Sequence, residues 1–312
     1  MRRYRTLTLG ASALALLVSA CSTGGGSSPS TNGTPPAAAT KPTVIVGSAD
    51  FYESALVAEI YAQALEGKGY TVQRKLNLGA RKLTNDSLKN NQLNLMPEYI
   101  GSEARELKAQ ATGDPQQTAQ ALKAALDPLG LTILDIAPGQ DQNGFAVRKE
   151  TADQFSLKSL TDAAKVADKL KWGLPPECKT NPSCGDALKS AYGIDIAKVQ
   201  VVKLAPCSAP MAQALNGKSV DVAELCTTQP DIKRFNFVLL EDDKKSQAAD
   251  NMVPVVRKDL LNAAGPDFSA ALNAVSSKLT TDALTTMGLK VNVNKEKVAD
   301  VARQFLADNG LS

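Results

Sequence analysis

The sequence contains no histidine, and aromatic residues make up only 4% of its 312 residues. The absence of histidine excludes Ser-His-Asp and Cys-His nucleophile pairs and most zinc hydrolase sites. Residues 78–81 (LGAR) lack the Walker pattern, so no phosphate-binding loop is indicated. The acidic run 241–243 is followed by two lysines, which is typical of a solvated loop. The sequence therefore predicts a protein that is not an enzyme and has no cofactor or metal.

Strong net charge and long apolar runs are also missing. The chain has 35 Lys and Arg against 32 Asp and Glu, and the two kinds are interspersed. This pattern offers no basic patch to a nucleic-acid partner, and we expect none. Beyond the first 20 residues, no apolar run approaches the roughly 20 residues that a transmembrane helix needs.

The first 20 residues have the pattern of a secretory signal peptide. Arginines at positions 2, 3 and 5 precede an apolar run over 7–18, and small residues lie before Cys21. Residues 17–21 (LVSAC) also resemble the bacterial lipoprotein box, in which this cysteine becomes the lipidated first residue. We expect an extracytoplasmic protein that Cys21 anchors to the cell membrane, in the periplasm or at the cell surface. Ordinary cleavage with an unmodified cysteine is the alternative.

Residues 21–42 separate this anchor from the folded part. Residues 22–41 include no Val, Leu, Ile or aromatic side chain and therefore cannot form a core. Such a composition is typical of a flexible tether, and about twenty residues have an r.m.s. reach of roughly 25 Å. The remaining residues, 43–312, are near the upper size of one globular unit, so we expect two lobes.

Four cysteines remain after Cys21, and an even number in an exported chain indicates disulfides. Four cysteines allow three pairings. Cys178 and Cys184 enclose a turn-rich loop of suitable size, so we expect a bond between them and, by elimination, a second between Cys207 and Cys226. A zinc site is disfavoured because the spacings do not match the usual finger patterns and histidine is absent.

Strand and helix patterns alternate along the folded part. Short β-branched or apolar runs predict strands near 43–47, 70–76, 93–96, 131–136, 144–147, 171–174, 199–204, 220–224, 237–240 and 252–256. Apolar residues at helical spacing predict helices near 52–66, 83–90, 116–126, 161–170, 186–192, 209–216, 268–278, 281–287 and 295–307. This alternation predicts an α/β protein with mostly parallel sheets. Ligands of such sheets bind beyond the carboxyl ends of the strands, here the loops at 48–51, 97–99, 175–177 and 227–228.

Four strings occur in a fixed order in the first third of the chain: 46–54 (VGSADFYES), 61–66 (YAQALE), 76–79 (LNLG) and 96–102 (MPEYIGS). Together they resemble the substrate-binding proteins of ABC-type osmoprotectant uptake systems, the glycine betaine/choline-binding family. The resemblance continues at 145–149 (FAVRK), 173–177 (GLPPE), 238–244 (VLLEDDK), 253–257 (VPVVR) and 278–281 (KLTT). It covers essentially all of residues 43–312.

The resemblance implies a two-lobed periplasmic-binding-protein fold of type II with two hinge crossings, near 138–145 and 248–253. Lobe 1 would comprise residues 43–140 and 250–312, and lobe 2 residues 141–249. The implied function is capture of a small quaternary-ammonium osmoprotectant of the choline or glycine betaine class and its delivery to the ABC permease subunits. The alternatives are a different small polar or cationic solute, or an exported sensor or enzyme that reuses the fold.

The family holds the ammonium group in a cage of aromatic rings. Transferred to this chain, the resemblance implies ligand contacts from Asp50, Phe51, Tyr99, Ser102, Phe145, Thr227, Asp250 and Asn251. Three positions depart from the family pattern, because Cys226 and Asp250 stand where tyrosines are common and Asp50 stands where asparagine is usual. Tyr52, Trp172 and Tyr192 are the candidates to replace the missing rings.

Each of these residues also has a structural interpretation. Tyr99, Phe145 and Trp172 could be core residues, Asp50 could stabilise the start of the helix that follows, and Asp250 could be an exposed hinge residue. If Asp50 and Asp250 do face the ligand, the added carboxylates favour a cation without its own carboxylate, such as choline, over a zwitterion such as glycine betaine.

Overall fold

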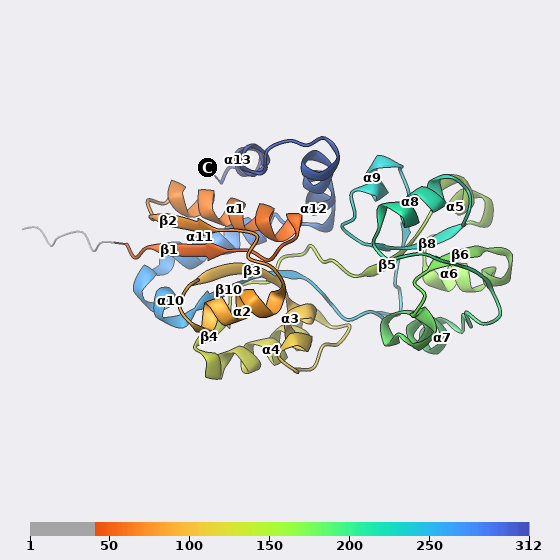
Figure 1. The fold of residues 1–312 in the computed structure, drawn as a ribbon, viewed down its shortest axis with the longest axis horizontal. Helices are drawn as coiled ribbons and strands as arrows, with labels where there is room; N and C mark the ends of the chain where they lie inside the picture. Colours follow the sequence, from red (N-terminus) through yellow and green to blue (C-terminus); the bar gives the residue numbers. More distant parts are fainter. Residues whose placement is uncertain (1–40, 312) are drawn as a thin grey trace, which may run out of the picture. The chain divides into compact units, whose positions relative to one another are not determined.

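The computed structural model describes residues 41–311, so the predicted signal peptide, Cys21 and nearly all of the predicted tether lie outside the described residues. The described chain forms two five-stranded sheets with helices packed around each (Figure 1). We call the part built on the sheet β2-β1-β3-β10-β4 lobe 1, and the part built on the sheet β7-β6-β8-β5-β9 lobe 2. The predicted α/β class with two lobes is confirmed.

Lobe 1 is assembled from both ends of the described chain. Its strands are β1 (Val44–Gly47), β2 (Val72–Lys75), β3 (Leu95–Tyr99), β4 (Leu131–Ile133) and β10 (Met252–Arg257). Its helices are α1 (Tyr52–Gly67), α2 (Arg81–Lys89), α3 (Ile100–Glu106), α4 (Pro115–Leu126), α10 (Lys258–Ala264), α11 (Pro266–Ser276), α12 (Thr281–Gly288) and α13 (Val298–Asp308).

Lobe 2 is one continuous stretch between two crossings of the chain. Its strands are β5 (Asn143–Val147), β6 (Lys171–Leu174), β7 (Gln200–Lys203), β8 (Val222–Cys226) and β9 (Val238–Leu240). Its helices are α5 (Lys149–Phe155), α6 (Leu160–Ala164), α7 (Ala187–Tyr192), α8 (Ala209–Asn216) and α9 (Asp231–Arg234). The predicted helix at 161–170 is shorter than expected and is followed by a single 3₁₀ turn, Ala167–Lys169.

In each sheet, four strands point the same way and one is reversed. β10 is antiparallel to both β3 and β4, and β5 is antiparallel to both β8 and β9. The reversed strand is the one by which the chain enters the lobe, and it starts at the edge where its neighbours end: Met252 pairs with Tyr99, and Asn143 pairs with Cys226. The prediction of mostly parallel sheets is therefore wrong, because half of the pairings in each sheet are antiparallel.

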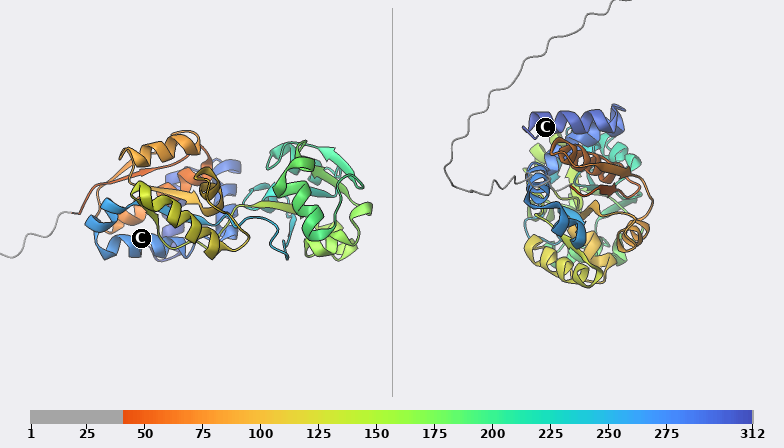
Figure 2. Two further views of the ribbon diagram at one scale, coloured as in Figure 1. Left: turned by 90° about the horizontal axis from the view of Figure 1, so that it is seen from below. Right: turned by 90° about the vertical axis from the view of Figure 1, so that its left-hand side faces the viewer.

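Both faces of each sheet are covered, which explains why central strands such as β3, β8 and β10 are buried along nearly their whole length, whereas the edge strands β2 and β7 are mostly exposed. In β10, Met252 and Val256 belong to the core beneath α1, α11 and α13, whereas Val253 and Val255 face the core beneath α2, α3 and α4. Figure 2 shows the helices on either side of the strands. The same alternation in β5 separates Phe145 from Ala146.

Helix α1 is the central helix of lobe 1. It is buried on almost its whole circumference, because the sheet covers one side and α11 and α13 cover the other. Its polar groups are paired where they enter the core: the Tyr61 hydroxyl lies 3.1 Å from Ser276 Oγ, and Glu59 accepts hydrogen bonds from Arg74 at 2.6 and 3.1 Å. This burial fixes the N-terminal end of α1, which begins at Tyr52 after Phe51.

Both predicted disulfides are present. Cys178–Cys184 closes the loop after β6, and Cys207–Cys226 ties the start of α8 to the end of β8. In the described part of the chain, no helix has the length and apolarity needed to cross a membrane.

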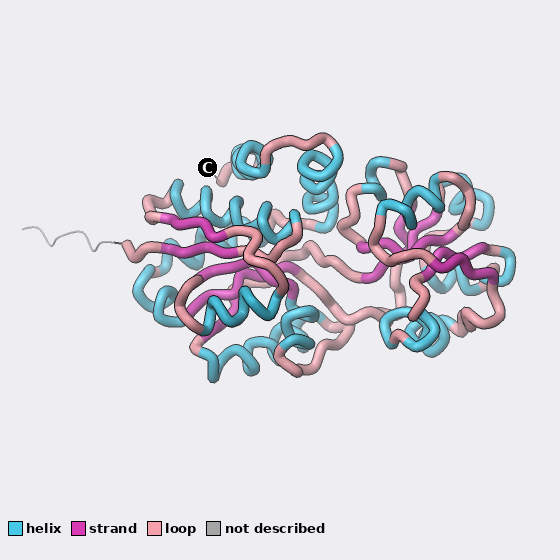
Figure 3. Tube along the Cα trace, in the orientation of Figure 1, coloured by secondary structure: helices cyan, strands magenta, loops and turns pink. Residues whose placement is uncertain are grey.

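The two crossings, 134–142 and 241–251, are hydrogen-bonded to each other. Asp141 N donates to Asp250 O at 2.9 Å, Met252 N donates to Gly139 O at 3.0 Å, and Gln142 Nε2 donates to Ala248 O at 2.7 Å. Figure 3 shows both crossings as loop segments between the strands of the two lobes. The chain passes from lobe 1 to lobe 2 through the first crossing and returns through the second, so the two form a short two-stranded connection.

Candidate functional site

A cavity of about 700 Å³ lies at the crossings, where the carboxyl ends of β3 and β8 face each other. Lobe 1 contributes residues from the N-terminal end of α1, from α2 and α3, from the end of β3 and from the segment after α12 to its wall, namely Phe51, Tyr52, Glu53, Arg81, Tyr99, Ser102, Arg105, Asn292 and Val293. Lobe 2 and the crossings contribute Asp141, Gln142, Asn143, Cys207, Cys226, Thr228, Gln229, Asp231, Arg234 and Asp250, among others. The volume is within the range of small-molecule sites. Three of the four loops predicted to hold a ligand contribute to this wall; the loop at 175–177 does not.

The aromatic part of the wall comes from lobe 1 alone. Phe51 and Tyr99 are stacked, with ring centroids 6.3 Å apart and planes 21° apart, and Tyr52 is the third ring. The only aromatic residues among the described lining are these three. The cavity is therefore half of an aromatic cage, and its lobe 2 side is polar.

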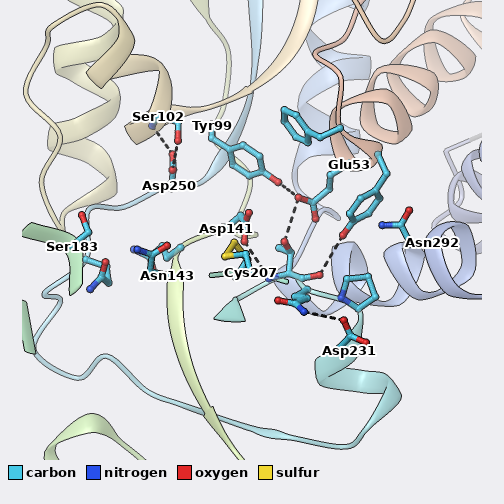
Figure 4. Close-up of a pocket in the computed structure, with 18 of the residues that line it drawn as sticks. Glu53, Tyr99, Ser102, Asp141, Asn143, Ser183, Cys207, Asp231, Asp250 and Asn292 are labelled. Carbon is cyan, nitrogen blue, oxygen red and sulfur yellow. Dashed lines mark hydrogen bonds between the residues drawn. A yellow bond between two sulfur atoms is a disulfide. The ribbon is translucent and has the colours of Figure 1, made fainter. Parts of the chain in front are cut away.

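Glu53 lies in the first turn of α1 and is 3% exposed. The Tyr99 hydroxyl and Thr228 Oγ1, the latter at 3.3 Å, both donate to its Oε2, while Oε1 has no hydrogen-bond partner among the described residues (Figure 4). Burial, together with the negative charge of Asp141, raises the pKa of Glu53 to about 8. The cavity thus contains a carboxyl group with one oxygen free to accept a hydrogen bond.

Asp141, which belongs to the first crossing, is a half-buried carboxyl group of the cavity wall. Thr228 N donates to its Oδ1 at 3.3 Å, and burial raises the pKa of Asp141 to about 6. The carbonyl of Thr228 accepts a hydrogen bond from the Tyr52 hydroxyl at 3.4 Å. Thr228 of lobe 2 is therefore bonded to Tyr52 and Glu53 of lobe 1 and to Asp141 between them.

Asp250 has a different role, because both oxygen atoms of its carboxylate already accept hydrogen bonds from the protein. It accepts hydrogen bonds from Gly101 N and Ser102 N, both at 2.8 Å, from Ser102 Oγ at 2.6 Å, and from Arg105 Nη2 at 3.3 Å. These bonds hold the second crossing against the start of α3. Gly101 permits this approach, since a Cβ there would lie 2.5 Å from the Ala249 carbonyl oxygen.

The basic side chains of the wall are also paired. Arg81 Nε contacts Glu98 at 3.0 Å and Glu103 at 3.6 Å, Arg105 contacts Asp250, and Arg234 contacts Asp231 at 3.7 Å. Glu53 and Asp141, by contrast, form no ion pair within the described part of the chain. Glu53 and Asp141 are therefore the groups of the site that add negative charge without a cationic partner whenever they ionise.

The residues predicted to contact a ligand are divided between the cavity and other places. Phe51, Tyr99, Ser102 and Asp250 line the cavity. Asp50 is exposed to solvent outside this lining, and Phe145 is 1% exposed in the core of lobe 2, where its ring packs edge-on against Trp172. Phe145 has the core position that was its alternative interpretation.

Thr227 and Asn251 are placed at the crossings and outside the cavity lining. Thr227 Oγ1 donates to Gln140 O at 2.9 Å, and Asn251 Nδ2 donates to Ala137 O at 3.0 Å. Both side chains therefore fasten crossing backbone.

The three candidate replacement rings also differ. Tyr52 lines the cavity. Trp172 is buried in the lobe 2 core and donates from Nε1 to Ala167 O at 3.1 Å, and Tyr192 donates to Asp242 away from the cavity. At the position where a further tyrosine is common, the Cys207–Cys226 disulfide forms part of the wall.

Glu53, Asp141 and Thr228 are the residues that sequence reasoning did not select. Each is inside a segment that it did select, since Glu53 follows Phe51 and Tyr52 in the first string and Asp141 falls in the first predicted crossing. An acidic residue in the first turn of a helix is ordinarily explained by the helix dipole, which conceals a binding role. Only the arrangement of the two lobes brings these three residues together.

The chain is similar to known proteins along most of its length. Residues 42–308 match the family model described as the substrate binding domain of ABC-type glycine betaine transport systems. A carnitine transport binding protein of Listeria monocytogenes is 24% identical over 274 residues, covering 86% of this chain and 87% of that protein. The glycine betaine-binding protein YehZ of Escherichia coli is 26% identical over 278 residues, covering 86% and 90%.

Solved structures show the same fold. The crystal structure of a glycine betaine/carnitine/choline ABC transporter protein has a TM-score of 0.78 at 22% identity, covering 86% of this chain and 99% of that one. Apo YehZ from Escherichia coli gives the same TM-score at 24% identity and the same coverage. Since the family model spans nearly all of the described residues, the chain belongs to the family of substrate-binding domains of ABC-type glycine betaine transport systems.

Proposed function

We propose that this protein is the extracytoplasmic receptor of an ABC importer and binds a small quaternary-ammonium solute, of the choline, glycine betaine or carnitine type, between its two lobes. The observation that carries the proposal is the cavity at the crossings, where three rings, the buried carboxyl group of Glu53 and the half-buried carboxyl group of Asp141 face the same space. Ring faces and carboxylates both attract a cation. Relatives named for carnitine and glycine betaine support the same ligand class.

The position of the cavity supports a receptor that closes on its ligand. Tyr52 and Glu53 on lobe 1 are within hydrogen-bond distance of Thr228 on lobe 2, so a ligand beside them contacts both lobes at once. Closure of two lobes about paired crossings is a known way to capture a small ligand. A permease can then distinguish the occupied receptor from the empty one by the relation between its lobes. In this role the protein binds its solute and releases it unchanged, without catalysis.

We also propose that Cys21 carries the lipid that keeps the receptor at the membrane. The lipoprotein-like string at 17–21 supports this. Anchoring would raise the effective concentration of the receptor near the permease. The test is replacement of Cys21 by alanine: the variant should move from the membrane fraction to the soluble extracytoplasmic fraction, and retention in the membrane would contradict the anchor.

Calorimetric titration of the purified protein with choline, glycine betaine, carnitine, simple amines and amino acids tests the ligand class. We expect saturable binding of at least one quaternary-ammonium solute, together with an upward shift of the unfolding temperature that grows with ligand concentration. Binding of an amino acid or sugar alone, with no response to any quaternary-ammonium compound, would contradict the proposed ligand class.

A further inference from the structure

The charge balance of the cavity indicates what kind of ligand completes it. Each arginine of the described wall already contacts a carboxylate: Arg81 contacts Glu98 and Glu103, and the other two contact Asp250 and Asp231. Glu53 is buried and Asp141 is half-buried, and neither forms such an ion pair with the described residues. A carboxyl group shielded from water ionises readily only beside a cation and otherwise keeps its proton, so a bound cation is the partner that lets these two groups carry charge.

Thr228 holds the two carboxyl groups at the same point of the cavity. Its hydroxyl donates to Glu53 Oε2 at 3.3 Å, and its backbone N–H donates to Asp141 Oδ1 at 3.3 Å. A residue bonded to both carboxyl groups through atoms of its own backbone and side chain keeps them close together. One small cation can therefore interact with both.

The oxygen atoms of Glu53 differ in what they still need. Oε2 receives the Tyr99 and Thr228 hydroxyls, whereas the buried Oε1 receives no hydrogen bond from the described residues. A buried acceptor without a donor is unfavourable. A quaternary nitrogen has no N–H and cannot satisfy this atom, but a hydroxyl or amine group elsewhere on the same cation can.

From these contacts we propose that Glu53 and Asp141 form the specificity-determining subsite for a small organic cation that carries an O–H or N–H donor and no carboxylate. The inference rests on the proposed function and narrows its ligand class. The rings of Phe51, Tyr52 and Tyr99 cover one side of the cation. On the other side, the two carboxylates attract the cation in place of aromatic rings from lobe 2. A zwitterion is disfavoured, because its carboxylate would face this acidic pair while the arginines of the wall are engaged.

A series of choline analogues tests each part of this inference. Choline has the charge and the hydroxyl, tetramethylammonium lacks the donor, 3,3-dimethyl-1-butanol lacks the charge, and glycine betaine has a carboxylate in place of the hydroxyl. In calorimetric titrations of the wild-type protein at pH 8, choline should bind at least about tenfold more tightly than each of the other three. Binding of glycine betaine or tetramethylammonium as tight as that of choline would overturn the inference and leave the proposed function standing. No binding of any quaternary-ammonium compound would overturn the proposed function itself.

Two charge-removing variants assign the effect to the proposed residues. Glu53→Gln and Asp141→Asn should each weaken choline binding by about tenfold or more and leave binding of the neutral 3,3-dimethyl-1-butanol little changed. Glu106→Gln makes the same chemical change at an exposed position on α3 and should bind choline as the wild type does. Thermal unfolding of each variant verifies that it is folded. Unchanged choline affinity in both folded variants would overturn the assignment, and the wild-type series stands whether or not the variants fold.

Discussion

Replacement of Glu53 by glutamine tests whether the buried carboxyl group of Glu53 lowers the stability of the ligand-free protein. The side chain is 3% exposed, and burial, together with the charge of Asp141, raises its pKa from the ordinary 4.5 to about 8. The other groups that face it are the hydroxyls of Tyr52, Tyr99 and Thr228, which act in the opposite direction on this pKa. Desolvation therefore outweighs the hydrogen bonds that the carboxyl group receives.

The sign and size of the effect follow from proton binding. In the unfolded chain Glu53 ionises near pH 4.5, whereas in the folded protein it keeps its proton up to about pH 8. Between these values the folded state binds more protons, so the free energy of unfolding falls as the pH rises, by about 1.4 kcal/mol for each pH unit. The pKa difference of about 3.5 corresponds to an upper limit of about 5 kcal/mol. Glutamine does not ionise, so this loss is absent from the variant, and any cost of its buried amide is independent of pH.

The assay is urea unfolding of the ligand-free wild type, Glu53→Gln and the exposed control Glu106→Gln at a series of pH values from 5 to 8. We expect the stability of Glu53→Gln relative to the wild type to increase steadily over this range, by several kcal/mol in total. The Glu106→Gln curve should run parallel to that of the wild type. Parallel curves for the wild type and Glu53→Gln would refute the argument, because they would mean that Glu53 ionises normally in the folded protein.

Three further outcomes can be measured. Affinity for choline should rise by up to about tenfold per pH unit between pH 6 and 8 and then level off, because binding of a cation releases the proton of Glu53. Calorimetry in buffers of different ionisation enthalpy would count that proton. An affinity that does not change with pH would contradict the coupling. Gly101→Ala should destabilise the protein by about 1–3 kcal/mol, since its Cβ would lie 2.5 Å from Ala249 O, and thermal unfolding identical to wild type would show that the crossing can shift freely. Reduction of Cys207–Cys226, which are 19 residues apart, should lower the free energy of unfolding by about 3 kcal/mol through loop entropy and should weaken ligand binding. Urea titration and calorimetry under reducing conditions measure the two effects.

The two-lobed α/β fold could be predicted from local patterns. The short β-branched runs and the apolar spacing of the helices place most elements within a few residues of those observed, as at Lys171–Leu174 and Ala209–Asn216. Four short helices, α3, α5, α9 and α10, were not predicted. Each begins directly after a strand or within a loop and has seven residues or fewer, which is too short for a helical repeat to stand out from the sequence around it.

Strand direction could not be obtained from the same patterns. An apolar strand that is buried on both faces has the same sequence signature whether its neighbours run parallel or antiparallel. The reversal of β5 and β10 depends on where each crossing meets its sheet, which is a property of the connection between lobes. The two disulfides, by contrast, followed from cysteine number and spacing.

By itself, the sequence determined the α/β class, the cysteine pairing and the segments that surround the cavity, and it predicts an export and lipidation signal around Cys21. Tertiary structure decided which residues within those segments face one another. Asp250 accepts hydrogen bonds from two backbone N–H groups and Ser102 and forms an ion pair with Arg105, whereas Glu53 and Asp141 have no cationic partner among the described residues. The physical reason is that the charge a ligand meets depends on which carboxylates already have partners, and those partners come from segments far apart in the chain.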